Sequence, residues 1–122
     1  MKKILVVDDS EVIVEVVKKT LQMYGYEEIL NASNGVEALE VAKKNKGYIA
    51  LYVFDVNMPQ MDGLTLVKEV RTFDTTTPII MLTTETDKEK MKTAKEHGAT
   101  GWIIKPFDGE KFIKVVQMYL KN

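Results

Sequence analysis

Five side chains that could do chemistry each follow a short apolar run in this sequence of 122 residues. Asp8 and Asp9 follow the first run, Asp55 and Thr83 follow two central runs, and Lys105 follows the last one. If these side chains converge, the three carboxylates repel one another by a few kcal/mol per pair at ~4 Å and an effective dielectric constant near 20. Folding alone gives no reason to gather them.

A divalent cation and a lysine would offset that repulsion. Mg²⁺ favours oxygen ligands and retains several waters, and Mn²⁺ fits the same ligands. An aspartate beside such a cation and Lys105 is suited to accept a phosphoryl group, because this transfer needs positioning and charge neutralisation. Taken singly, the residues allow a plainer interpretation: Ser10 and Thr83 as helix caps and Lys105 as a solvated lysine.

The hydropathy pattern predicts the elements that position these residues. Short β-branched and aromatic runs indicate buried strands, with a more polar one at an edge. The predicted strands span residues 3–7, 28–31, 49–54, 79–82 and 102–104. The predicted amphipathic helices span residues 10–24, 34–45, 64–73, 87–97 and 108–120. This alternation predicts an α/β fold with a doubly wound, five-stranded parallel sheet, whose ligands bind beyond the carboxyl ends of the strands.

Composition excludes several classes of function. Seventeen basic and eighteen acidic side chains give a net charge of −1, so we expect no nucleic-acid surface. The sequence has no cysteine and a single histidine, His97, which excludes thiol chemistry and a multi-histidine metal site. The first apolar run stops at Asp8, too early for a signal peptide or a membrane span. We therefore expect one cytoplasmic domain over residues 1–122, with no separate output domain and no membrane partner.

Four segments in order resemble a response-regulator receiver domain of the single-domain CheY type. They are residues 6–10 (VVDDS), 54–63 (FDVNMPQMDG), 81–83 (MLT) and 105–107 (KPF). The resemblance covers essentially the whole chain and implies the flavodoxin/CheY-like fold with strand order 2-1-3-4-5. It also implies a histidine kinase as the phosphoryl donor and, from residues 57–64, a link to chemotaxis.

The same resemblance implies roles for individual residues. Asp55 would be the phosphoacceptor. Asp9 would bind Mg²⁺ directly and Asp8 mainly through water, with Asp55 and the backbone carbonyl of Asn57 as further ligands. Such a protein would catalyse its own phosphorylation and dephosphorylation without turning over a separate substrate.

Further positions implied by the family concern switching and lifetime. Thr83 and Lys105 would each contact a phosphoryl oxygen, and the bond before Pro106 would be cis. Trp102 stands where the family has its switch aromatic, although a tryptophan in a short strand is also typical of a core. Three residues flanking the site would tune hydrolysis of the phosphoaspartate: Asn57, Thr84 and Glu85.

Two helices carry more apolar residues than a core face requires. Val12 and Val14 flank the apolar face of the helix at 10–24, which is either broadly buried or an edge that docks on a kinase. Ile113, Val115 and Met118 are in excess on the last helix. With Trp102 and Ile104 they would form a patch that binds a target, or a second copy, after phosphorylation.

Two other functions remain open. A degenerate receiver could act as a docking module independent of phosphorylation, although its five site residues are intact. An aspartyl-phosphate hydrolase of the haloacid-dehalogenase type shares Asp, Thr and Lys, but places its nucleophile in Asp-x-Asp after the first strand, where this chain has Asp8-Asp9-Ser10. A flavodoxin would need a phosphate-binding loop after the first strand, and none is present.

Overall fold

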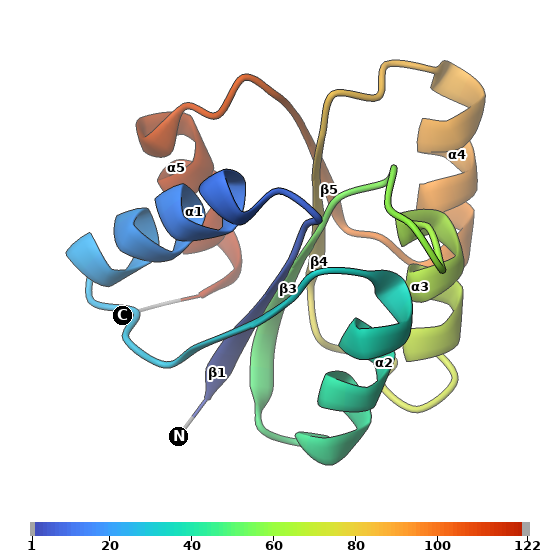
Figure 1. Ribbon diagram of the computed structural model, residues 1–122, viewed down its shortest axis with the longest axis horizontal. Coiled ribbons are helices and arrows are strands. Elements are labelled where there is room, and N and C mark those ends of the chain that lie inside the picture. The colour runs from blue at the N-terminus through green and yellow to red at the C-terminus, as the bar shows by residue number, and fades with distance from the viewer. Residues whose placement is uncertain (1, 121–122) are drawn as a thin grey trace.

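The computed structural model describes residues 2–120, which form one parallel sheet between two layers of helices (Figure 1). The strands are β1 (Lys3–Val7), β2 (Ile29–Ala32), β3 (Ile49–Phe54), β4 (Ile79–Thr83) and β5 (Gly101–Ile104). The helices are α1 (Glu11–Met23), α2 (Gly35–Lys44), α3 (Gly63–Val70), α4 (Lys88–His97) and α5 (Gly109–Tyr119). The strand order is β2-β1-β3-β4-β5, and every pairing is parallel, which confirms the predicted fold.

Alternate residues of the sheet enter two separate cores, because successive side chains of a strand point to opposite faces. Leu5, Phe54 and Met81 pack against α2, α3 and α4. Val6 and Leu82 belong to the other core, which packs against α1 and α5. Figure 1 shows these two groups of helices on opposite sides of the sheet. The strands are buried on both faces, as a parallel sheet requires.

Each helix begins where a short polar side chain caps it. Ser10, Asn34, Asp62, Asp87 and Asp108 are the N-caps, and each accepts a hydrogen bond from a backbone N–H of the first turn. These local bonds satisfy donors that the helix itself cannot. They explain why the helix starts agree closely with the sequence prediction.

Helix α3 ends at Val70, three residues before the predicted end. The chain tightens there into a turn in which Thr72 N–H donates to Glu69 O at 3.1 Å and Phe73 N–H to Val70 O at 3.1 Å. Such i→i+3 bonds commonly finish a helix. The apolar pattern continues through this turn, which is why periodicity alone extended the helix.

The predicted core faces are partly wrong. In α1 the buried residues are Val14, Val17 and Leu21, whereas Val16 and Tyr24 are 40% and 42% exposed. Val14 is therefore a core residue and not part of a docking edge. In α5 Ile113 is buried, so it does not contribute to the predicted surface patch. In α2 Val36 is exposed, and Ala38 and Ala42 are the buried apolar side chains.

No helix within residues 2–120 is long and apolar enough to cross a membrane.

Candidate functional site

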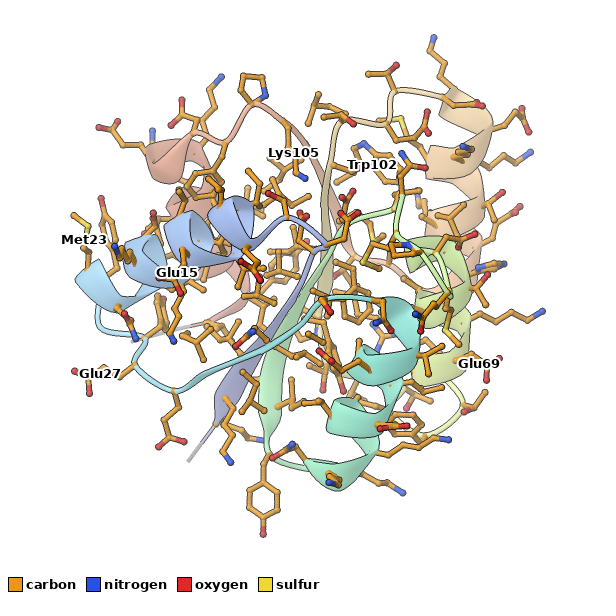
Figure 2. All side chains as sticks on the ribbon, in the orientation of Figure 1. Glu15, Met23, Glu27, Glu69, Trp102 and Lys105 are labelled. Atoms are coloured by element: carbon orange, nitrogen blue, oxygen red, sulfur yellow. The ribbon has the colours of Figure 1, made fainter. Side chains whose placement is uncertain are left out.

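The five candidate residues lie at one edge of the sheet, where the carboxyl ends of the strands meet. Asp8 and Asp9 follow β1, Asp55 follows the neighbouring β3, Thr83 ends β4, and Lys105 follows β5. Figure 2 shows Lys105 at this edge. The convergence follows from the parallel pairing, since each strand brings its carboxyl end to the same side.

Lys105 joins the two buried carboxylates. Its Nζ atom lies 2.8 Å from Asp8 Oδ2 and 3.3 Å from Asp55 Oδ2. The side chain of Lys105 is 12% exposed, so water screens these contacts weakly. Burial alone would lower the pKa of Lys105, but the hydrogen bond to Asp8 and the charges of Asp55 and Asp8 outweigh it and raise that pKa. The ammonium is therefore held in its charged form, and the interpretation as a solvated lysine is wrong.

The carboxylates form a compact group of oxygen atoms. One oxygen each from Asp8, Asp9 and Asp55 lie within 4.8 Å of one another, with Asp9 exposed and the other two buried. Burial raises the pKa of Asp8, and the charge of Asp55 adds to this effect, although Lys105 and the Ser10 N–H lower it. One lysine does not neutralise three carboxylates. This anionic, all-oxygen donor set fits a hard divalent cation such as Mg²⁺, with Asp9 open to water.

The remaining oxygens of the buried carboxylates have fixed partners. Asp8 Oδ1 accepts a hydrogen bond from Ser10 N–H at 2.9 Å, and Asp55 Oδ1 accepts one from Val56 N–H at 2.7 Å. Asp55 Oδ2 faces the ammonium of Lys105, which offsets the negative charge of the Asp55 carboxylate. Ser10 also caps α1 through its hydroxyl, as its plainer interpretation predicts.

Thr83 is fully buried at the end of β4, and it is not a helix cap. Its Oγ1 atom accepts a hydrogen bond from Glu85 N–H at 3.1 Å, while Asp87 caps α4. Because the hydroxyl accepts from Glu85, its own proton remains available to donate to an oxygen at the site. The backbone N–H of Lys105 donates to Thr83 O at 2.8 Å, so β4 and β5 stay paired up to the site.

Trp102 lies on the same face of the sheet as Thr83. It pairs with Met81, and Ile104 pairs with Thr83, so these four side chains share one face because of the period-two alternation. Trp102 is partly buried against the core cluster beside α4, and Figure 2 labels it on that side of the sheet. Its indole Nε1 is buried and, within residues 2–120, has no hydrogen-bond partner.

The other predicted site residues surround this group. Asn57 and Thr84 are exposed, and Glu85 is half-buried. The peptide bond between Lys105 and Pro106 is cis, which agrees with the resemblance. Sequence reasoning missed Lys90, which contacts Glu85 at 3.0 Å, since an exposed lysine on a charged helix carries no distinguishing signal.

The loop after β3 is held by two close approaches of the backbone. A Cβ added to Gly63 would overlap the carbonyl oxygen of Asp55, and one added to Gly35 would overlap that of Met61. Gly63 N–H also donates to Val56 O at 2.8 Å. The first residues of α2 and α3 therefore fix the segment that carries Asp55 and Asn57.

A doubly wound sheet with this arrangement of aspartates, threonine and lysine has the architecture of an aspartyl-phosphate signalling domain. The chain belongs to the response regulator receiver domain family, whose model matches residues 4–117. It is 46% identical over 107 residues to the chemotaxis protein CheY1 of Helicobacter pylori, an alignment that covers 86% of each chain.

Solved structures of chemotaxis proteins are also similar to this chain. The chemotaxis protein CheY4 of Vibrio cholerae is 47% identical, with a TM-score of 0.89 and coverage of 98% of this chain and 99% of that one. CheY in the CheX-CheY-BeF3-Mg²⁺ complex from Borrelia burgdorferi is 29% identical, with a TM-score of 0.92 and coverage of 98% and 90%.

Proposed function

We propose that this protein is a CheY-like response regulator that accepts a phosphoryl group on Asp55 from a phosphohistidine kinase, with Mg²⁺ bound at the acidic cluster. The observation that carries the proposal is the position of Lys105 Nζ between Asp8 and Asp55. Asp55 directly follows β3, and β3 lies between the two strands that carry the other site residues. Asp8 and Asp9 follow β1 on one side, and Thr83 ends β4 on the other.

Each residue of the site has its own role in phosphoryl transfer. An oxygen of Asp55 bonds to phosphorus as the P–N bond of the phosphohistidine breaks and the imidazole leaves. Lys105 and the Thr83 hydroxyl would then each contact a phosphoryl oxygen and stabilise its charge. Asp8, Asp9 and the backbone carbonyl of Asn57 would hold Mg²⁺, or Mn²⁺ in its place, which supplies the remaining charge neutralisation. Water later cleaves the O–P bond and regenerates the carboxylate.

The pathway assignment rests on the relatives. The Helicobacter and Vibrio proteins carry the name of chemotaxis proteins at 46% and 47% identity. We propose that this protein also acts in chemotaxis signalling and that the receiver itself binds the target. The cytoplasmic location expected from the sequence remains a prediction.

The direct test is transfer of a phosphoryl group to Asp55. We expect wild-type protein with acetyl phosphate and Mg²⁺ to gain the mass of one phosphoryl group and to change its Trp102 fluorescence. Asp55→Asn should do neither, while Asp62→Asn, an exposed aspartate of the same loop, should behave as wild type. A docking module would show no transfer to Asp55, and a hydrolase would instead turn over small phosphate monoesters.

We propose α1 as the surface that meets the kinase. Val12 is 72% exposed and Val16 is 40% exposed one turn later, on the helix that follows Asp9. Introducing Val12→Lys and Val16→Lys together should slow transfer from the kinase by about tenfold, since burial of apolar surface is the main favourable term in most protein–protein association. Phosphorylation by acetyl phosphate should be unchanged, as should kinase transfer to Met23→Lys at the far end of α1 (Figure 2). Equal rates for the double variant and wild type would contradict this assignment.

We propose the face formed by α4, β5 and α5 as the surface for a target or a second copy. Met118 is 73% exposed and Ile104 is 40% exposed. A pocket of about 310 Å³ between α4 and β5 is lined by Met91, Ala94 and Trp102, among others. We expect self-association or target affinity to rise on phosphorylation, measured by sedimentation with and without acetyl phosphate. Equal association of the two forms would contradict a switch, because a ligand without differential affinity shifts no equilibrium.

A further inference from the structure

The side chain of Glu85 links three segments around the phosphoacceptor site. Its Oε1 atom accepts hydrogen bonds from Lys90 Nζ on α4 at 3.0 Å and from Asn57 Nδ2 in the β3–α3 loop at 3.4 Å. Its Oε2 atom accepts one from Asp87 N–H at 3.2 Å. We call the contact between Lys90, Glu85 and Asn57 the Glu85 bridge. The backbone N–H of Glu85 also contacts the hydroxyl of Thr83.

The Glu85 bridge spans the rim of the site. Asn57 lies two residues after Asp55, and Glu85 lies two residues after Thr83, on loops that follow the adjacent strands β3 and β4. A water that hydrolyses a phosphoaspartate must approach phosphorus opposite the bond to Asp55, since attacking and leaving oxygens are roughly in line. Phosphorus bonded to Asp55 would lie between these two loops, so a side-chain contact that joins the loops would narrow the approach of the water.

Helix α4 depends on few contacts, which makes Lys90 important for the bridge. Ala94 is the only residue of α4 that is fully buried. The carboxyl end of the helix is bonded to α3, because His97 Nδ1 lies 2.8 Å from Leu64 O and Arg71 donates two hydrogen bonds to Gly98 O. At the amino-terminal half, Lys90 provides an ion pair to the loop that carries Glu85.

We propose that Lys90 is a positioning residue that holds Glu85 in this bridge and thereby slows hydrolysis of the phosphoryl group on Asp55. This inference rests on the proposed function. The ion pair also lowers the pKa of Glu85, mainly through the hydrogen bond from Lys90, so Glu85 is charged at neutral pH and pairs with the lysine. An ion pair at the surface favours one geometry only modestly, so we expect its loss to change the population of the bridge by up to about fivefold.

The test measures loss of the phosphoryl group after the donor is removed. We expect Lys90→Ala to speed hydrolysis by about two- to fivefold and Lys90→Arg to leave it near the wild-type rate, since arginine can keep the pair. Lys92→Ala is the matched control, because Lys92 is exposed on the same helix and has no ion pair within residues 2–120.

Two further measurements test whether Lys90 acts through Glu85. In a Glu85→Ala background, adding Lys90→Ala should change the hydrolysis rate no further. In wild type, 1 M salt should speed hydrolysis, because it screens the exposed pair.

Several results would overturn the inference. Unchanged or slower hydrolysis in Lys90→Ala would do so, as would an equal acceleration in Lys92→Ala. Acceleration by Lys90→Ala that persists without the Glu85 carboxylate would show that Lys90 acts through helix stability instead. If wild type itself gains no phosphoryl group, the proposed function fails. If wild type is phosphorylated normally and Lys90→Ala matches it, only the role of Lys90 fails.

Discussion

Lys105→Met is expected to lower the free energy of unfolding by about 3 kcal/mol in the absence of divalent cations, because it leaves two buried carboxylates without their counter-charge. Lys105 Nζ is the partner of both Asp8 Oδ2 and Asp55 Oδ2, whose side chains are 4% and 9% exposed. Methionine keeps the unbranched stem but not the charge. Phosphorylation by acetyl phosphate should fall by about 100-fold, the usual cost of removing one group that stabilises charge in a transition state.

The pH dependence of this effect has a defined sign. The pKa of Asp8 is already raised above 3.8 by burial, and losing Lys105 raises it further. A carboxyl group whose pKa is raised in the folded state destabilises the fold when it is ionised. This destabilisation is lost as the pH falls through the folded-state pKa and the carboxylate is protonated. The stability difference between Lys105→Met and wild type should therefore shrink on acidification from pH 7.

Mg²⁺ should stabilise the variant more than wild type, because one positive charge no longer opposes the cation. Urea unfolding with EDTA and with Mg²⁺, at pH 7 and pH 5, measures these effects. Lys111→Met, at an exposed position of α5, serves as the control for loss of a lysine. A variant as stable as wild type in EDTA at pH 7 would contradict the assigned role of Lys105.

The elements of this fold were predictable from sequence because their signals are local. Buried strands are continuous apolar runs, and the caps at Ser10, Asn34 and Asp108 bond to backbone atoms within one turn. The site was predictable for a topological reason. Parallel strands bring residues as distant as Asp8 and Lys105 to one edge, whatever the details of the packing.

The features that sequence missed depend on tertiary packing. A helical wheel gives α1 a broad apolar arc, but contact with the sheet and α5 decides that Val14 is buried and Val16 is exposed. The Glu85 bridge joins side chains at the surface from two loops and a helix, with Glu85 itself half-buried, so its existence depends on loop conformation and side-chain rotamers. No periodicity or cap distinguishes Lys90 from its neighbours Lys88 and Lys92.

Gly63→Ala is expected to destabilise the fold by about 3 kcal/mol, because a methyl group at this position would overlap the carbonyl oxygen of Asp55. The loop after β3 cannot give way easily, since it also packs closely on Gly35 at the start of α2. Any adjustment must move the backbone of Asp55, the proposed phosphoacceptor. We therefore expect molecules that remain folded to accept the phosphoryl group poorly.

Gly109→Ala provides a matched comparison, because both glycines are the first residue of a helix and both follow an aspartate cap. At Gly109 the nearest atom to an added Cβ would be a methyl carbon of Thr20 at 3.3 Å, a side chain that can shift. Alanine also restricts the unfolded chain, which favours folding by about 0.4–1 kcal/mol where the backbone allows it. We expect Gly109→Ala to change stability by less than about 1 kcal/mol and to leave phosphorylation intact. Equal effects of the two substitutions in urea unfolding would show that helix propensity, and not the contact with Asp55, explains the glycine at position 63.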